Sequence, residues 1–394
     1  MREFRISEVC NVISGGTPST KISSYWNGDV VWLTPKDLSN NKSKYIYDSE
    51  NKITEEGLSR SSTQLLPPNT VLLSSRAPIG YLAIAGKSLC TNQGFKSMVC
   101  NQDLIIPEYL YYLLQTKVED FNNISTGSTF KELSSSLLKQ YKISIHDLPE
   151  QSHIVDILGT LDDKIENNEK ITILLLKKIQ FYYIEKFLKK SKTLVPFQYF
   201  IDSTIGGDWG KDEPSKSNNT KVICIRGADI SDISQGKEGS PPTRFILEKN
   251  CKLKKLCAWD IIVEISGGSP TQSTGRSTLI TNYLLDLYNT PIICTNFCRA
   301  IKCKKVEYAP YVYAAFNYLY NTNVFFNYEN GTTGIKNLDL DAILNEQEVY
   351  LPSESELVDF YNYTKDIQEQ VMRLRTENQK LNELKQLYLK KFFG

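Results

Sequence analysis

The side chains that most often carry out catalysis are scarce in this sequence. It has only two histidines, His146 and His153, so a histidine-based triad or a histidine-rich metal site has little material. His146 lies next to an Asp-Leu-Pro segment, where a histidine is more often structural than catalytic. No group of cysteine, histidine and carboxylate residues has the spacing typical of a metal site. We therefore expect no catalytic residue and no metal ligand in this chain.

One segment, Gly80–Ser88, resembles a phosphate-binding loop. It has five residues between its two glycines, whereas the loop needs four to wrap its amides around a phosphate. Its apolar run predicts a strand instead. The sequence also lacks the Asn-Pro-Pro-aromatic and Asp-Pro-Pro-Tyr tetrapeptides with which an amino-methyltransferase grips a flipped base. Any methyl transfer is therefore expected of a partner.

The composition is that of an ordinary folded protein. With 394 residues, 41% hydrophobic and 23% charged, the chain is long enough for two or three domains. Its net charge is only +1, but residues 211–305 contain fifteen Lys and Arg against nine Asp and Glu. This distribution permits a basic face of the kind that binds phosphates, although scattered solvated charges would give the same count.

The sequence also predicts the cellular compartment. The N-terminus has no apolar segment behind a basic one, and no run of about 18 uncharged apolar residues could span a bilayer. The nine cysteines never form a Cys-x-x-Cys pair, so reduced, buried thiols in a reducing cytosol are the expected state. We therefore expect a cytoplasmic protein without a membrane partner.

The sequence contains an internal repeat of about 200 residues. This repeat is expected to position the residues that could bind a ligand. Four segments of the first half recur as similar segments, in the same order, in the second half. Cys90-Thr91-Asn92 returns as Cys294-Thr295-Asn296, Val31–Leu38 as Ile223–Ile230, Thr70–Ser74 as Asp260–Glu264, and Asp147-Leu148-Pro149 as Tyr350-Leu351-Pro352. The predicted organisation is two copies of a mixed domain, 1–149 and 194–352, each followed by a helical segment, 150–193 and 353–394.

Each mixed domain is predicted to contain short strands and a helix. In the first copy, Val30–Leu33, Thr70–Ser74, Tyr81–Ile84 and Gly94–Val99 are apolar or alternating runs between Gly, Pro and Asn residues. A helix is expected from Pro107, because proline favours the first helical position, and Pro310 repeats that start.

The two helical segments each carry a heptad pattern, with seam residues spaced alternately by three and four. At 1.5 Å per residue, each helix would be on the order of 50 Å long. The alternative is an imperfect helix on a domain surface. If the two helices pack on each other, the residues predicted to form the contact are Leu158, Leu161, Ile165, Asn168, Leu175 and Ile179 with Ile367, Val371, Leu374, Asn378 and Leu381. The asparagines would fix register and partner at some cost in stability.

Taken together, these motifs resemble the specificity subunits of type I restriction–modification systems over nearly the whole chain. The first half carries Gly15–Ser19, Trp32–Leu38, Leu72–Gly80 and Thr91–Phe95; the second carries Gly206–Gly210, Arg226–Ile230 and Ser266–Arg276. The second half lacks the Thr-Pro-Lys and Arg-Ala-Pro-Ile-Gly strings of the first. Two domains that differ in this way should read different half-sites.

The resemblance implies an α+β fold of two target recognition domains, related by a pseudo-two-fold axis and joined by two long antiparallel coiled-coil helices. It also implies a non-catalytic subunit that binds a bipartite, asymmetric site in double-stranded DNA and docks two methyltransferase subunits. Restriction and translocase subunits would complete the complex. S-adenosylmethionine, ATP and Mg²⁺ would be used by those partners, and this chain is expected to bind none of them. Half-sites would lie about one helical turn, ~10 base pairs, apart.

Specific DNA reading uses Arg or Lys for guanine and phosphate, and Asn or Gln for adenine, on loops that a rigid scaffold holds in a groove. The base-reading candidates are Lys36, Arg76, Gln93 and Lys96 in the first domain and Arg226, Gln272, Arg276 and Arg299 in the second. Gly-Thr-rich turns could hold backbone phosphates through Ser128, Thr129, Lys131, Thr332, Thr333 and Lys336. Each of these residues could equally be a solvated surface residue or a turn former. Asn92 and Asn296 are expected to be structural, because their position before a strand repeats.

Two other functions remain open from the sequence. The first is a scaffold whose coiled coil assembles partners and whose domains bind protein; its affinity for DNA would depend little on salt. The second is the specificity subunit of a related type II system that cuts on both sides of its site. A partner's sequence would distinguish the second from a type I subunit.

Overall fold

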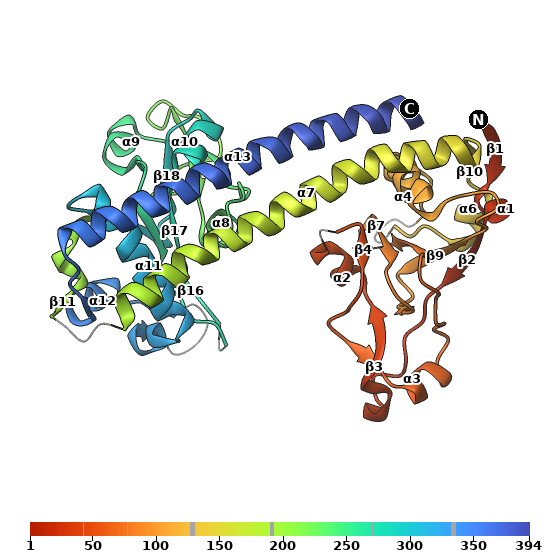
Figure 1. Ribbon diagram of the computed structural model, residues 1–394, viewed down its shortest axis with the longest axis horizontal. Coiled ribbons are helices and arrows are strands. Elements are labelled where there is room, and N and C mark those ends of the chain that lie inside the picture. The colour runs from red at the N-terminus through yellow and green to blue at the C-terminus, as the bar shows by residue number, and fades with distance from the viewer. Residues whose placement is uncertain (42, 77, 127–130, 190–192, 270, 332–335) are drawn as a thin grey trace. The chain divides into compact units, whose positions relative to one another are not determined.

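The computed structural model describes residues 1–41, 43–76, 78–126, 131–189, 193–269, 271–331 and 336–394. The chain forms two compact units. Unit 1 consists of Met1–Asn167 and Gln379–Gly394, and unit 2 consists of Asn168–Asn378. Two long helices, α7 (Leu148–Tyr183) and α13 (Glu354–Phe393), supply residues to both units (Figure 1). None of the helices in the described ranges is long and apolar enough to cross a membrane.

Unit 1 is built on a five-stranded sheet in the order β2-β9-β6-β7-β4, a three-stranded sheet in the order β5-β3-β8, and the pair β1-β10. Its strands are β1 (Arg2–Arg5), β2 (Cys10–Ser14), β3 (Trp26–Leu33), β4 (Tyr45–Ile46), β5 (Lys52–Ile53), β6 (Val71–Ser75), β7 (Ile79–Ala85), β8 (Cys90–Thr91), β9 (Phe95–Cys100) and β10 (Lys142–Ile145). Its short helices are α1 (Ile6–Val9), α2 (Pro35–Asn40), α3 (Glu55–Ser59), α4 (Pro107–Gln115), α5 (Val118–Ile124) and α6 (Ser135–Gln140).

Unit 2 has a four-stranded sheet in the order β12-β19-β15-β17, three-stranded sheets β14-β13-β18 and β16-β21-β20, and the pair β11-β22. Its strands are β11 (Leu194–Pro196), β12 (Ile201–Gly206), β13 (Thr220–Ile225), β14 (Thr243–Ile246), β15 (Ile261–Glu264), β16 (Ser266–Gly267), β17 (Ser277–Leu279), β18 (Ile292–Cys294), β19 (Cys298–Cys303), β20 (Glu329–Asn330), β21 (Lys336–Leu338) and β22 (Glu348–Tyr350). Its short helices are α8 (Gly227–Ser234), α9 (Glu248–Lys254), α10 (Asn282–Tyr288), α11 (Ala309–Asn321) and α12 (Leu340–Glu346).

The two units share a core topology, and their helices and mainly antiparallel sheets confirm the α+β class. In each, one strand pairs in parallel with a short strand, β3 with β8 and β13 with β18. In each, three antiparallel neighbours follow the same order, β2-β9-β6 and β12-β19-β15. The helices that start at a proline also recur, since α4 begins at Pro107 and α11 has Pro310 at its second position. The predicted strands and both predicted helix starts are therefore present. In the segment that resembles a phosphate-binding loop, residues 80–85 lie in strand β7.

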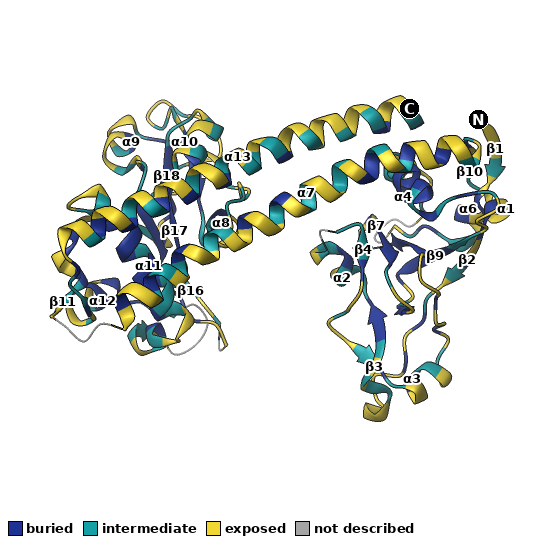
Figure 2. Cartoon of the chain, viewed as in Figure 1, coloured by how far each residue is buried: buried dark blue, intermediate teal, exposed yellow. Residues whose placement is uncertain are grey.

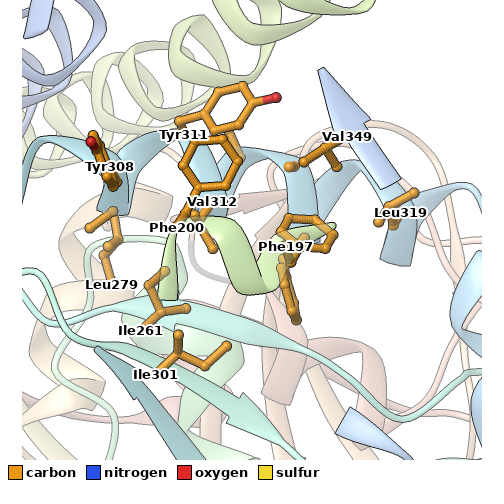
Figure 3. Close-up of a cluster of buried hydrophobic side chains, with 14 of the residues drawn as sticks. Phe197, Phe200, Ile261, Leu279, Ile301, Tyr308, Tyr311, Val312, Leu319 and Val349 are labelled. Atoms are coloured by element: carbon orange, nitrogen blue, oxygen red, sulfur yellow. The ribbon is translucent and has the colours of Figure 1, made fainter. Parts of the chain in front are cut away.

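The core of unit 2 is rich in aromatic side chains. Phe197 and Phe200 lie between α11, which carries Tyr311 and Val312, and the sheet strand that carries Ile261 (Figure 3). Phe197 and Phe316 meet edge to face, with ring centroids 4.7 Å apart, an arrangement that aromatic pairs favour. This packing fixes the position of the strands whose ends form the site described below.

The long helices pack on each other within each unit, as the heptads predict, and they run antiparallel, as the resemblance implies. In unit 2, Asn168 of α7 bonds Asn378 of α13, and Tyr182 packs against Tyr363 with ring centroids 4.7 Å apart. In unit 1, Lys385 pairs with Asp162 at 2.6 Å. The predicted seam residues are all buried or half-buried, and the remaining faces of both helices are largely exposed (Figure 2).

All nine cysteines are free thiols. Cys257 is exposed and Cys100 and Cys303 are half-buried, whereas the other six are buried. Burial raises the pKa of Cys90 to about 11 and that of Cys294 to about 12. The buried thiols therefore stay protonated and inert near neutral pH.

The asparagine pair gives a test of the helix contact. Asn168 is fully buried and donates from Nδ2 to Asn378 at 2.9 Å and to Glu377 at 2.8 Å. Replacing Asn378 alone by Leu removes a partner of a buried amide, which should lower the free energy of unfolding by about 1–3 kcal/mol. The double replacement by Leu should recover or exceed wild-type stability, because an apolar seam needs no polar partner.

Urea unfolding of the wild type, both single variants and the double variant measures this coupling. Asn362→Leu on the exposed face of α13 serves as the control for the added hydrophobic residue. Strictly additive losses in the double variant would show that the asparagines do not interact across the seam.

Candidate nucleic-acid interface

In unit 1, three loops meet where their strands end. The amide of Gly16, after β2, donates to the Thr91 carbonyl of β8 at 2.9 Å, and Thr17 donates to the side chain of Gln93. The amide of Ser75, at the end of β6, donates to the Gly94 carbonyl at 2.7 Å, so the next residue, Arg76, belongs to the same edge. We call Thr17, Lys36, Arg76 and Gln93 the strand-end site of unit 1.

Lys36 lies at the start of α2, next to the residue that packs on the Gln93 loop. The Thr34 amide donates to the Asp37 carboxylate at 2.7 Å and caps that helix, and Pro35 lies against Gly94. Lys36 is exposed and pairs with Glu50 at 2.7 Å, and this hydrogen bond raises the pKa of the Lys36 ammonium. An exposed ion pair of this kind is weak, so the ammonium can exchange Glu50 for a phosphate or a base.

In unit 2, the equivalent loops surround a surface recess of about 460 Å³. The Asp208 amide, after β12, donates to the Cys294 carbonyl of β18 at 2.9 Å, as Gly16 does to Thr91. The recess is lined by Trp209, Arg226, Gly227, Ala228, Glu264, Ser266, Thr295, Asn296 and Phe297. We call Trp209, Arg226, Asn296 and Phe297 the strand-end site of unit 2.

Two exposed aromatic side chains distinguish this recess from the polar edge of unit 1. Phe297 is 57% exposed and Trp209 is 41% exposed. The Trp209 ring is held from behind by the buried Arg244, whose guanidinium carbon lies 4.1 Å from the ring centroid. Ordered, exposed aromatic faces are common in ligand and nucleic-acid sites.

The register of the parallel strand pairs corrects the alignment of the repeated Cys-Thr-Asn tripeptide. Leu33 pairs with Thr91 in unit 1, and its counterpart Ile225 pairs with Cys294, so Thr91 corresponds to Cys294 and not to Thr295. The Cys-Thr-Asn identity is therefore displaced by one residue from the true alignment.

The same shift separates the two asparagines. In unit 1 the Asn92 side chain accepts from the Gly94 amide at 2.8 Å, and in unit 2 the Thr295 hydroxyl accepts from the Phe297 amide at 3.3 Å. Asn92 is structural, as expected. The prediction that Asn296 is structural was wrong, because Thr295 takes that role and Asn296 is exposed at the position of Gln93.

The predicted arginines of unit 2 are engaged by carboxylates. Arg226 makes two bonds to Asp229, each of 3.0 Å, and Arg276 makes two to the buried Glu264, of 2.9 and 2.6 Å. The hydrogen bonds that Arg276 donates to Glu264 raise the pKa of the Arg276 guanidinium. Both guanidinium groups already make a bidentate contact with a carboxylate, so neither is free to make the bidentate contact that reads guanine.

Other predicted contacts lie outside the strand-end sites. Lys96 on β9 is buried and pairs with Glu132 at 3.5 Å, which disfavours it as a base-reading residue. Arg299 pairs with Asp341, and Lys336 with the buried Glu329. The remaining positions are Gln272, bonded to the Tyr320 hydroxyl, and Lys131, bonded to the Asn122 carbonyl, while Ser128, Thr129, Thr332 and Thr333 lie outside the described residues.

Of the sequence candidates, Arg76 and Gln93 thus lie on the strand-end loops of unit 1 and Lys36 follows the Pro35 that lies against them, whereas in unit 2 only Arg226 lines the recess. Sequence reasoning missed Trp209, Asn296 and Phe297. The signal was available, because Trp209 lies in the Gly206–Gly210 motif and Asn296-Phe297 follow the repeated strand. Finding them required the register of that strand.

The described part of the chain contains no cluster of three or more Cys, His, Asp or Glu side chains that could hold a metal ion. His146 is hydrogen-bonded through Nδ1 to the Tyr109 hydroxyl at 2.8 Å, and this bond fixes its ring against the core helix α4. The strand-end sites offer carboxamides and cations, and in unit 2 exposed aromatic faces, all of which can contact a ligand.

The strand-end loops depend on a glycine in each unit. A Cβ added to Gly207 would overlap the carbonyl oxygens of Thr295 and Cys294, and Gly15 meets Asn92 and Thr91 in the same way. Gly207→Ala should therefore lower the free energy of unfolding by about 1–3 kcal/mol. Gly206→Ala is the matched control, since nothing lies within 4 Å of a Cβ there, and its effect should stay within about 0.5 kcal/mol.

Thermal and urea unfolding of both variants measure the difference. Equal stability of the Gly206→Ala and Gly207→Ala proteins would mean that the loop can move away from the strand end.

Comparisons with known proteins identify relatives of both units. Residues 1–177 match the family model described as the type I restriction modification DNA specificity domain. The chain is 35% identical over 318 residues to the type I restriction enzyme MjaIX specificity subunit of Methanocaldococcus jannaschii, covering 80% of this chain and 70% of that protein. It is 28% identical over 164 residues to the type I restriction enzyme EcoR124I/EcoR124II specificity subunit of Escherichia coli, covering 40% of each.

Among solved structures, the S subunit of a type I restriction–modification system from M. genitalium covers 100% of this chain and 96% of its own length. The TM-score is 0.55 at 16% sequence identity. This likeness shows a shared fold.

Proposed function

Because this chain belongs to the family of type I restriction–modification specificity subunits, we propose that it reads a bipartite, asymmetric site in double-stranded DNA. Residues 1–149 and 194–352 act as the two target recognition domains, each reading one half-site. The helical segments 150–193 and 353–394 set the distance between them. The chain itself carries out no catalytic step.

The observation that carries this proposal is the recurrence of one strand-end site with different side chains. Gln93 and Asn296 occupy the same place in the two units, as do Arg76 and Ser266. A duplicated scaffold with unlike loops is suited to reading two unlike half-sites, because the scaffold places each loop while side chains supply the specificity.

The partners follow from the family. Two methyltransferase subunits would dock on this chain and methylate an adenine in each half-site with S-adenosylmethionine. Restriction and translocase subunits would add ATP- and Mg²⁺-dependent host defence. Exposed apolar side chains on the long helices support a docking role: Leu174 and Phe181 of α7 are 60% and 62% exposed, and Leu387 of α13 is 66% exposed.

Methylome sequencing tests the proposal. Cells that express this chain with its neighbouring methyltransferase subunit should gain a new adenine-methylated motif made of two short half-sites and a fixed spacer. Cells with the methyltransferase subunit alone are the control and should lack that motif.

The absence of a new motif in the co-expressing cells would contradict the proposal. A single continuous motif that tolerates any spacer length would contradict the assignment of one half-site to each domain.

A further inference from the structure

We propose that Asn296 is a base-reading residue of unit 2: its carboxamide contacts the major-groove edge of an adenine, with Phe297 against the methyl group of a thymine. Gln93 has the corresponding role in unit 1, where its carboxamide oxygen exchanges the Thr17 hydroxyl for the base. The inference rests on the proposed function and names the chemistry by which each half-site is read.

The side chains of Asn296 and Gln93 leave equivalent, rigidly held backbone positions in the two units. The carbonyls on either side of the reading residue are fixed by the sheet: Cys298 N donates to Thr295 O at 2.9 Å, and Ile265 N donates to Phe297 O at 2.8 Å. In unit 1, Phe95 N donates to Asn92 O, and Ser75 N donates to Gly94 O, in the same pattern. Asn296 and Gln93 are the residues between these anchors, so their side chains leave the same rigid backbone position.

The Asn296 carboxamide is available for a contact with a base. Asn296 is exposed, and its carboxamide makes no hydrogen bond to a described residue, whereas the Asn92 carboxamide is committed to the Gly94 amide. Its polar neighbours are neutralised: Arg226 is paired with Asp229 and bonds the Ser240 carbonyl, and Glu264 is paired with Arg276. Among the described residues that line the recess, the Asn296 carboxamide is therefore available both as a donor and as an acceptor.

The chemistry of these two side chains matches an A·T base pair. An Asn or Gln carboxamide presents one donor and one acceptor side by side, which match N7 and N6 of adenine in the major groove. Exposed Phe297 follows Asn296 directly, and an aromatic ring at a base edge favours the thymine methyl group. An amide and an aromatic ring on consecutive residues therefore fit an A·T pair better than a G·C pair.

The experiment uses the complex of this chain with its methyltransferase partner. Binding is measured for the duplex of the methylome motif and for duplexes with each base pair of the second half-site replaced in turn. The wild type should discriminate against replacement of one A·T pair by about ten- to a hundred-fold. Asn296→Ala should reduce this to about three-fold or less at that pair, and leave discrimination in the first half-site unchanged. Asn345→Ala, at an exposed asparagine on α12, is the matched control and should behave as the wild type.

A second arm tests Phe297. Replacing the relevant thymine by deoxyuridine removes only the methyl group and should weaken wild-type binding by about two- to ten-fold. Phe297→Ala should be insensitive to that replacement. Gln93→Ala should lose discrimination in the first half-site alone.

Unchanged discrimination by Asn296→Ala at all positions of the second half-site would overturn the inference, as would a loss confined to the first half-site. A wild-type complex with no preference for any split sequence would instead refute the proposed function. The two failures are therefore distinguished by the wild-type measurement.

Discussion

The close contact between a glycine and the end of a short parallel strand determines how each unit presents its loops. Gly15 and Gly207 lie so near the strand-end carbonyls that no side chain fits between them. This contact brings the loop after the first sheet strand against the loop that carries Gln93 or Asn296. The exposed side chains of the loops can then vary without moving the loops, since backbone contacts and the inward-facing Asn92 and Thr295 hold them.

The paired helices impose a second constraint, on register. Asn168 and Asn378 are buried polar side chains in an apolar seam, where they bond to each other. In any other register each would be buried without its partner, which would lower stability. In unit 1, Asp162 accepts bonds from both Lys385 and the Tyr112 hydroxyl, and so ties the helix pair to α4. A polar pair in one unit and an ion pair in the other both select a single antiparallel alignment of the two helices.

The elements of this fold could largely be predicted because their signals are local. Pro107 marks the start of α4, the heptads mark α7 and α13, and the apolar runs mark the central strands. The residues of the candidate site were harder to predict from the sequence, for two physical reasons. Asparagine and threonine side chains both accept a bond from the amide two residues ahead, so Asn92 could be replaced by Thr295 and the identical tripeptide was misleading. Ion pairing depends on residues far apart in sequence, so the commitment of Arg276 to Glu264 could not be foreseen.

The most direct test of the account is photocrosslinking of the assembled complex on a duplex that carries both half-sites. A photoreactive residue is placed at position 93 in one sample and at position 296 in another, and the crosslinked nucleotides are mapped. We predict crosslinks to bases of one half-site from position 93 and to bases of the other half-site from position 296. Crosslinks from both positions to the same half-site, or to no base in either, would contradict it.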